Sequence, residues 1–238
     1  MALLPLPEDW DRALAVVAHP DDLEFGASSA VARWTAAGKT VAYVLATRGE
    51  AGIDSLDPEQ CAVVRSAEQC ASAQVVSIQD VTFLDYRDGV LTHSLELRRD
   101  LARAIRSHRP DILVSINHHS TFGPGSLNHA DHRALGGALL DATRDAANRW
   151  VFPELVAEGL EPWHGLRFAA FNASPMADHF VDVTDFLHKG IASLAEHRVY
   201  LENLDGDFDL VQFLRSNAEQ AGIEAGVPLA VTFEVVNL

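Results

Sequence analysis

Ala18-His-Pro-Asp-Asp-Leu-Glu-Phe-Gly26 joins an apolar run to a helical pattern, and this junction indicates the fold class. The run before it, residues 13–18, is continuously apolar, as in a strand buried on both faces. The residues after it carry apolar side chains at helical spacing, namely Ala27, Ala30, Val31 and Trp34. The polar turn therefore follows the carboxyl end of a strand, where open α/β sheets bind their ligands.

Strand and helix patterns alternate along the rest of the chain, which predicts an α/β fold with a mostly parallel sheet covered by helices on both faces. We expect further strands at 40–46, 81–84, 112–116, 166–171 and 179–183. We expect the later helices at 58–74, 95–108, 128–148 and 185–201, and an ordered loop or short helix at 150–162. Asp57 and Pro58 are typical of a helix start. Asn128 is predicted to cap the helix that follows it, with Asp131 three residues on.

No composition shift, repeat or linker divides the chain, so residues 1–238 are predicted to form a single domain. The last part, residues 201–238, is expected to be a less regular C-terminal extension. It holds an acidic turn with Asp205, Asp207 and Asp209, a helix near 210–221 and an apolar strand near 229–236.

Composition excludes several classes of function. The formal net charge of −16 would repel a nucleic acid or an anionic membrane. No apolar run is long enough to span a bilayer, and the N-terminus lacks the features of a signal peptide, so we expect a cytoplasmic protein with no integral membrane segment. Cys61 and Cys70 lie nine positions apart in one predicted helix, about 13 Å along its axis, which is too far for a disulfide.

Two short motifs together suggest a metal site. His19 and Asp22 lie three residues apart at the strand-to-helix turn, and His129 and His132 have the same spacing at the start of a later helix. Each motif alone also fits a simple helix cap. Together they offer the His, Asp and His ligands of a catalytic zinc site, or equally of a non-haem iron site. Asp21 is left over as a general base for a metal-activated water.

The same residues carry a family resemblance. Ala18-His-Pro-Asp-Asp-x-Glu with a later His-x-Asp-His resembles the PIG-L/LmbE family of zinc-dependent N-deacetylases. The likeness extends over roughly residues 13–200, through Thr47-Arg-Gly-Glu50, Tyr86-Arg-Asp-Gly89, Arg109-Pro-Asp111 and Val181-Asp-Val-Thr-Asp185. The resemblance implies a Rossmann-like fold and hydrolysis of the N-acyl group of a small N-acetylated amino sugar. Homo-oligomers are also common in the family.

The resemblance also implies a role for each site residue. His19, Asp22 and His132 would bind Zn²⁺, with Fe²⁺ or another divalent metal as alternatives, and Asp21 would activate water. His129 would be protonated and would stabilise the oxyanion or protonate the leaving amine, with Asp131 orienting it. Spacing alone does not decide which of the two histidines binds the metal. Arg48 and Asp88 resemble substrate contacts of the family.

Other residues and functions are weaker candidates. His118 and His119 end a strand at the edge of the site and fit a polar loop better than a site, and His197 fits a surface or core position. An amidase acting on thiol-sugar conjugates would use the same site. A non-catalytic sugar- or nucleotide-binding module is disfavoured because the first turn lacks the G-x-G-x-x-G pattern, and its carboxylates would repel a pyrophosphate.

Overall fold

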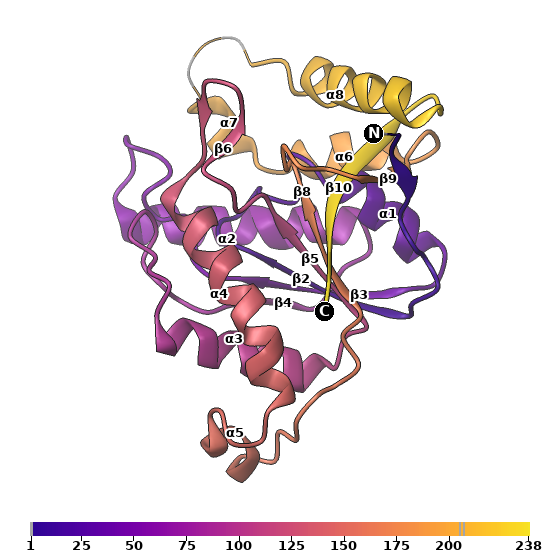
Figure 1. The fold of residues 1–238 in the computed structure, drawn as a ribbon. Helices are drawn as coiled ribbons and strands as arrows, with labels where there is room; N and C mark the ends of the chain where they lie inside the picture. The colour runs from indigo at the N-terminus through magenta and orange to yellow at the C-terminus, as the bar shows by residue number, and fades with distance from the viewer. Residues whose placement is uncertain (1, 205, 207) are drawn as a thin grey trace.

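A computed structural model describes residues 2–204, 206 and 208–238. Its core is a sheet of eight strands in the order β1-β9-β10-β8-β5-β2-β3-β4 (Figure 1). Strands β8, β5, β2, β3 and β4 are parallel, and β10 runs antiparallel between β8 and β9. This confirms the α/β class. The strands are β1 Leu4–Pro5, β2 Arg12–Val17, β3 Thr40–Leu45, β4 Val81–Phe83, β5 Ile112–Ile116, β8 Phe168–Asn172, β9 His179–Asp182 and β10 Ala230–Asn237. A separate hairpin joins β6 Thr121–Gly123 to β7 Ser126–Leu127.

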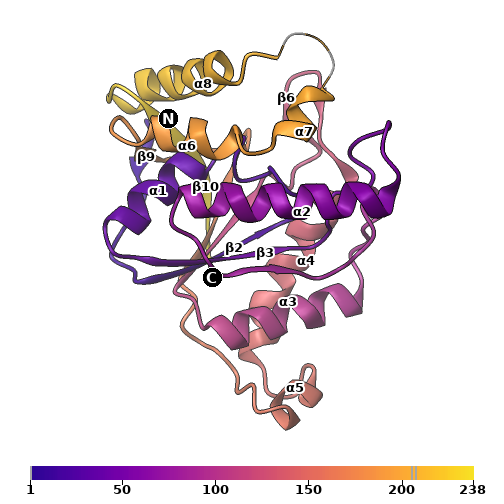
Figure 2. The same cartoon turned by 180° about the vertical axis from the view of Figure 1, so that it is seen from behind.

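Helices cover both faces of the sheet (Figures 1 and 2). Both faces of the sheet are apolar and need to be covered. In strand β2, for example, neighbouring side chains such as Leu14 and Ala15 belong to two different apolar cores. The core on one face contains residues of α1 Ser28–Ala36 and α2 Pro58–Val75, and α6 Leu187–Leu194 packs against both helices. The core on the other face contains residues of α3 Leu95–His108 and α4 Ala130–Ala147. The short helices are α5 Pro153–Ala157 and α7 Arg198–Glu202.

The C-terminal segment contains the helix and the strand that the sequence predicted. Helix α8 Leu210–Ala225 packs on α6 as an outer layer, and β10 enters the central sheet. Asp209 caps α8 by accepting a hydrogen bond from the Gln212 amide, whereas Asp205 and Asp207 of the predicted acidic turn lie outside the described residues. None of the helices in the described part of the chain is long and apolar enough to cross a membrane.

Two local predictions differ from the structure. The single helix predicted at 185–201 is wrong, because the chain breaks between α6 and α7 where the fully buried His197 leaves helical geometry. The cap predicted at Asn128 is also wrong. The N-cap of α4 is His129, which makes no side-chain capping bond. The Asn128 oxygen instead accepts from the His129 amide and faces the His132 ring. The pair Cys61 and Cys70 is free, as predicted.

The strand order reverses next to β2, and this reversal positions the site. From β2 the chain winds outward through β3 and β4, then returns along α3 to β5 on the other side of β2. The turn after β2 and the loop before α4 therefore diverge from the carboxyl ends of two adjacent parallel strands. Such a reversal opens a crevice for a ligand.

Candidate metal centre and active site

Three potential metal ligands meet at this crevice. Asp22 Oδ1 lies 3.0 Å from His132 Nε2 and 3.7 Å from His19 Nδ1, and the two ring nitrogens are 3.2 Å apart. A tetrahedral zinc with nitrogen and oxygen ligands at about 2.0–2.1 Å holds its ligand atoms about 3.3–3.4 Å apart. The three atoms therefore already have the spacing of one face of such a coordination shell.

The protein fixes which atom each ligand presents. Asp22 Oδ2 accepts hydrogen bonds from the backbone amides of Ala18 and His19 at 3.0 and 2.9 Å, so Oδ1 turns toward the two imidazoles. His19 Nε2 faces Asp88 Oδ1 at 3.0 Å and Asp131 Oδ2 at 3.3 Å. A proton on Nε2 satisfies both carboxylates and leaves the Nδ1 lone pair for a metal.

Asn128 fixes which nitrogen of His132 carries the proton. Its amide nitrogen donates to the carbonyls of Asn117 and His119, both at 2.8 Å, so its oxygen is an acceptor. That oxygen lies 2.8 Å from His132 Nδ1, which must then carry the proton. The Nε2 lone pair of His132 therefore faces the centre. Sequence reasoning missed this role, although Asn128 directly precedes the histidine motif.

Electrostatics favour a cation at this point. Burial lowers the pKa of His19, but Asp22, Asp131 and Asp88 outweigh burial and raise this pKa well above its usual value. Burial raises the pKa of Asp22, but His132 and His19 more than compensate and leave it well below its usual value. The metal-free site thus attracts a proton where a metal ion would bind, and its two imidazoles and one carboxylate fit a divalent ion such as zinc.

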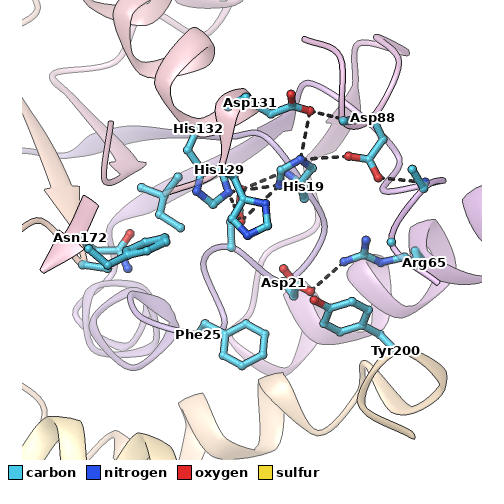
Figure 3. Close-up of a pocket in the computed structure, with 18 of the residues that line it drawn as sticks. His19, Asp21, Phe25, Arg65, Asp88, His129, Asp131, His132, Asn172 and Tyr200 are labelled. Atoms are coloured by element: carbon cyan, nitrogen blue, oxygen red, sulfur yellow. Dashed lines mark hydrogen bonds and ion pairs between the residues drawn. The ribbon is translucent and has the colours of Figure 1, made fainter. Parts of the chain in front are cut away.

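Asp21 lies beside the ligands in a strained turn, with φ of 88° and only 6% of its surface exposed. Burial raises its pKa to about 6, although the Arg65 charge opposes this rise. Arg65 Nη2 donates to Asp21 Oδ2 and to the Pro20 carbonyl, each at 2.7 Å. The Tyr200 ring stacks on the Arg65 guanidinium, 4.2 Å from its carbon, and its hydroxyl lies beside Asp21 (Figure 3).

Arg65 is a site residue that sequence reasoning missed, since one arginine within a helix carries no distinguishing signal. Its position demands glycine in the loop after β3. A Cβ on Gly49 or Gly52 would lie 2.3 or 2.2 Å from Arg65 Nη1. The glycines of this loop therefore let a buried guanidinium approach the Asp21 turn.

Of the other predicted site residues, His129 lies near the candidate metal ligands and Arg48 lies away from them. His129 lines the pocket, and its ring centre lies 5.0 Å from that of His132 and 6.0 Å from that of His19. Burial and the two neighbouring imidazoles lower its pKa, whereas the resemblance implies a protonated ring. Arg48 points away, and its Nε donates to Asp85 at 2.5 Å.

Asp131 does not have the partner that the resemblance implies. Its oxygens accept from the backbone amides of Gly89 at 2.7 Å and Leu91 at 3.1 Å, and Oδ2 faces His19. These bonds direct the carboxylate to His19 instead of His129. Asp88 also lines the pocket, where it faces His19 and accepts from the Ala51 amide.

The centre opens into a cavity of about 670 Å³. The candidate metal ligands and Asp21 form part of its wall, and Phe213 also lines it. Figure 3 shows the rings of Phe25 and Tyr200 at this wall. His118, His119 and His197 do not line it in the described part of the chain. The cavity has the size of a small-molecule site.

Comparisons with known proteins agree with this geometry. The family model PIG-L, described as GlcNAc-PI de-N-acetylase, matches residues 14–143. Diacetylchitobiose deacetylase of Thermococcus kodakarensis is 27% identical over 195 residues, 79% of this chain and 70% of that protein. A 1D-myo-inositol 2-acetamido-2-deoxy-alpha-D-glucopyranoside deacetylase of Kineococcus radiotolerans is 30% identical over 177 residues, 57% of this chain and 47% of that protein. The structure of N,N'-diacetylchitobiose deacetylase from Pyrococcus horikoshii, 25% identical, superposes with a TM-score of 0.85 over 96% of this chain and 85% of that one.

Proposed function

Because the chain belongs to the PIG-L family of GlcNAc-PI de-N-acetylases, we propose that it hydrolyses the N-acetyl group of a small amino sugar. The observation that carries this proposal is the convergence of the lone pairs of His19 Nδ1 and His132 Nε2 with Asp22 Oδ1, beside the buried carboxylate of Asp21. The named relatives, which remove acetyl groups from amino sugars, support the choice of substrate.

We assign zinc to His19, Asp22 and His132. When bound, the metal would polarise the amide carbonyl and lower the pKa of a water molecule. Asp131 and Asp88 would hold the Nε2 proton of His19, and Asn128 would hold the Nδ1 proton of His132, so that both rings keep one orientation.

The chain's own residues then move the protons. Asp21 accepts a proton from the attacking water as the new C–O bond forms. His129, on the pocket wall, donates a hydrogen bond to the amide oxygen, a role that a neutral ring can fill, and Asp21 passes the proton taken from water to the leaving nitrogen. The C–N bond breaks to give acetate and the free amino sugar. Arg65 keeps Asp21 in place through its hydrogen bonds to the Asp21 carboxylate and the Pro20 carbonyl.

The test is acetate release from N-acetylglucosamine and N,N'-diacetylchitobiose by the zinc-loaded protein. Asp21→Asn keeps the side-chain shape, and asparagine tolerates the positive φ that alanine would not. We expect it to bind zinc but to lower kcat by about 10²–10⁴-fold, the usual contribution of a general base. Asp141→Asn, which removes an exposed charge outside the pocket, is the matched control. Full activity of Asp21→Asn would exclude the assigned role.

A further inference from the structure

A second cavity, of about 430 Å³, adjoins the first beneath α8. The two share five lining residues, Phe25, Phe122, Asn172, Ala173 and Asn217. Shared walls of this kind make them two chambers of one groove across the sheet edge. The first chamber contains the metal ligands, and the second extends along the inner side of α8.

A buried amide without partners lies at the junction of the chambers. Asn172 ends β8, is 1% exposed and lines both cavities. Neither its Oδ1 nor its Nδ2 has a hydrogen-bond partner among the described residues. Buried polar atoms are nearly always hydrogen-bonded, so an unpaired donor and acceptor facing a cavity point to a ligand.

Gly26 leaves room for this amide at the junction. A Cβ on Gly26 would lie 1.8 Å from Asn172 Nδ2, so only glycine leaves room for the side chain. Figure 3 shows Asn172 on the opposite side of the three histidines from Arg65 and Asp88. A ligand that reaches Asn172 from the metal centre therefore extends toward the second chamber.

The lining of the second chamber indicates the chemistry of that ligand. Its polar side chains are mostly uncharged hydroxyls and amides: Ser29, Asn172, Ser174, Asn217, Gln220 and Thr232. In the part of the chain that the structure describes, no lysine, arginine or histidine lines it, and Glu224 is its one acidic residue. An anionic group would thus find no counter-charge, whereas a neutral polyol would find donors, acceptors and the rings of Phe25 and Phe122.

We propose that the second chamber binds the second sugar ring of an N-acetylated disaccharide, and that the Asn172 amide hydrogen-bonds this ring. The proposal rests on the deacetylase function inferred above. It makes Asn172 and the inner face of α8 determinants of substrate length, separate from the metal centre and Asp21.

The test compares two substrates on three variants. Ala221→Trp fills the second chamber, which Ala221 lines. Ile223→Trp adds the same ring to the outer side of α8, where Ile223 is 78% exposed. Asn172→Ala removes the amide. We expect Ala221→Trp and Asn172→Ala to lower the ratio of kcat/KM for N,N'-diacetylchitobiose to kcat/KM for N-acetylglucosamine by about tenfold or more, and Ile223→Trp to leave the ratio unchanged.

Calorimetric binding of N,N'-diacetylchitobiose to the zinc-loaded Asp21→Asn protein gives a second readout that does not need turnover. Affinity should fall about tenfold or more when Asn172→Ala or Ala221→Trp is added. An equal loss for both substrates, an unchanged ratio, or unchanged binding would overturn the proposal while leaving deacetylation in place. Absence of acetate release from both substrates would instead refute the proposed function. The binding measurement would still show whether the second chamber binds the second sugar ring. Thermal melts of each variant verify that it is folded.

Discussion

Asn128 offers the sharpest test of how the metal centre is built. Its buried side chain accepts from His132 Nδ1 and from the His129 amide, and it donates to the carbonyls of Asn117 and His119. Asn128→Ala removes all four bonds. Asn128→Asp keeps the acceptor for His132 and removes only the two donated bonds. The two variants therefore separate ring orientation from loop stability.

The magnitudes follow from these contacts. Each lost hydrogen bond contributes about 1 kcal/mol, so Asn128→Ala should lower the unfolding free energy of the metal-free protein by about 3–4 kcal/mol. Losing the orienting partner of a metal-binding histidine weakens metal binding about 10–100-fold, or about 1.4–2.7 kcal/mol. Asn128→Asp should also destabilise the protein, because its carboxylate faces two carbonyls, but it should retain zinc affinity since it still accepts the Nδ1 proton.

The assays are zinc competition against a chromophoric chelator and urea unfolding of the metal-free protein. We expect Asn128→Asp to bind zinc as tightly as the wild type does, and Asn128→Ala to bind it about 10–100-fold more weakly. Equal losses in the two variants would mean that Asn128 acts only through the loop. Zinc affinity of Asn128→Ala within about threefold of wild type would refute the tautomer assignment itself, because a partner of this kind contributes at least tenfold.

Two further predictions concern charges outside the centre. Arg48→Ala should change kcat/KM by less than about threefold, because Arg48 forms an exposed ion pair with Asp85, a type worth about 0–1 kcal/mol; a loss near 100-fold in acetate release would restore it as a substrate contact. Burial raises the pKa of Glu8, but hydrogen bonds from Arg33 and Trp34 outweigh burial and lower it below 4.5. The stabilisation from Glu8 is therefore complete above the unfolded pKa and is lost as pH falls through the folded pKa. The melting-temperature gap between wild type and Glu8→Gln should shrink on acidification below pH 4.5, and a gap that widens would contradict this sign.

Local spacing was sufficient to single out the candidate metal ligands, although it left open which of His129 and His132 binds the metal. His19 and Asp22 follow one apolar strand, His129 and His132 lie beyond the loop after another, and parallel strands end at one edge of a sheet. The pattern does not show that these two strands are neighbours. Pairing of β2 with β5 joins residues about a hundred positions apart, and it depends on the crossover through α3.

Other residues of the cavity wall were beyond sequence reasoning for the same reason. Arg65, Tyr200 and Asn172 lie on elements distant in the sequence, and each has an ordinary local context. Asp131 lies against His19, whereas the resemblance pairs it with His129, because the direction of its carboxylate depends on the backbone amides of Gly89 and Leu91, which no spacing rule includes. Roles that depend on tertiary hydrogen bonds become visible only once the chain is folded.

The charges of the cavity wall favour a cation at the candidate metal centre. The cavity wall contains the carboxylates of Asp21, Asp22, Asp88 and Asp131 but, among described residues, only the Arg65 guanidinium as a fixed positive charge. Two imidazole nitrogens and a carboxylate oxygen face one another within 3.7 Å, a cluster that attracts positive charge. A divalent ion would neutralise much of this excess negative charge and leave Asp21 as an ionised base held by Arg65. On the proposed assignment, the turn after β2 supplies two of the three metal ligands, His19 and Asp22, and also the base, Asp21, so metal loading and proton transfer would depend on the same turn.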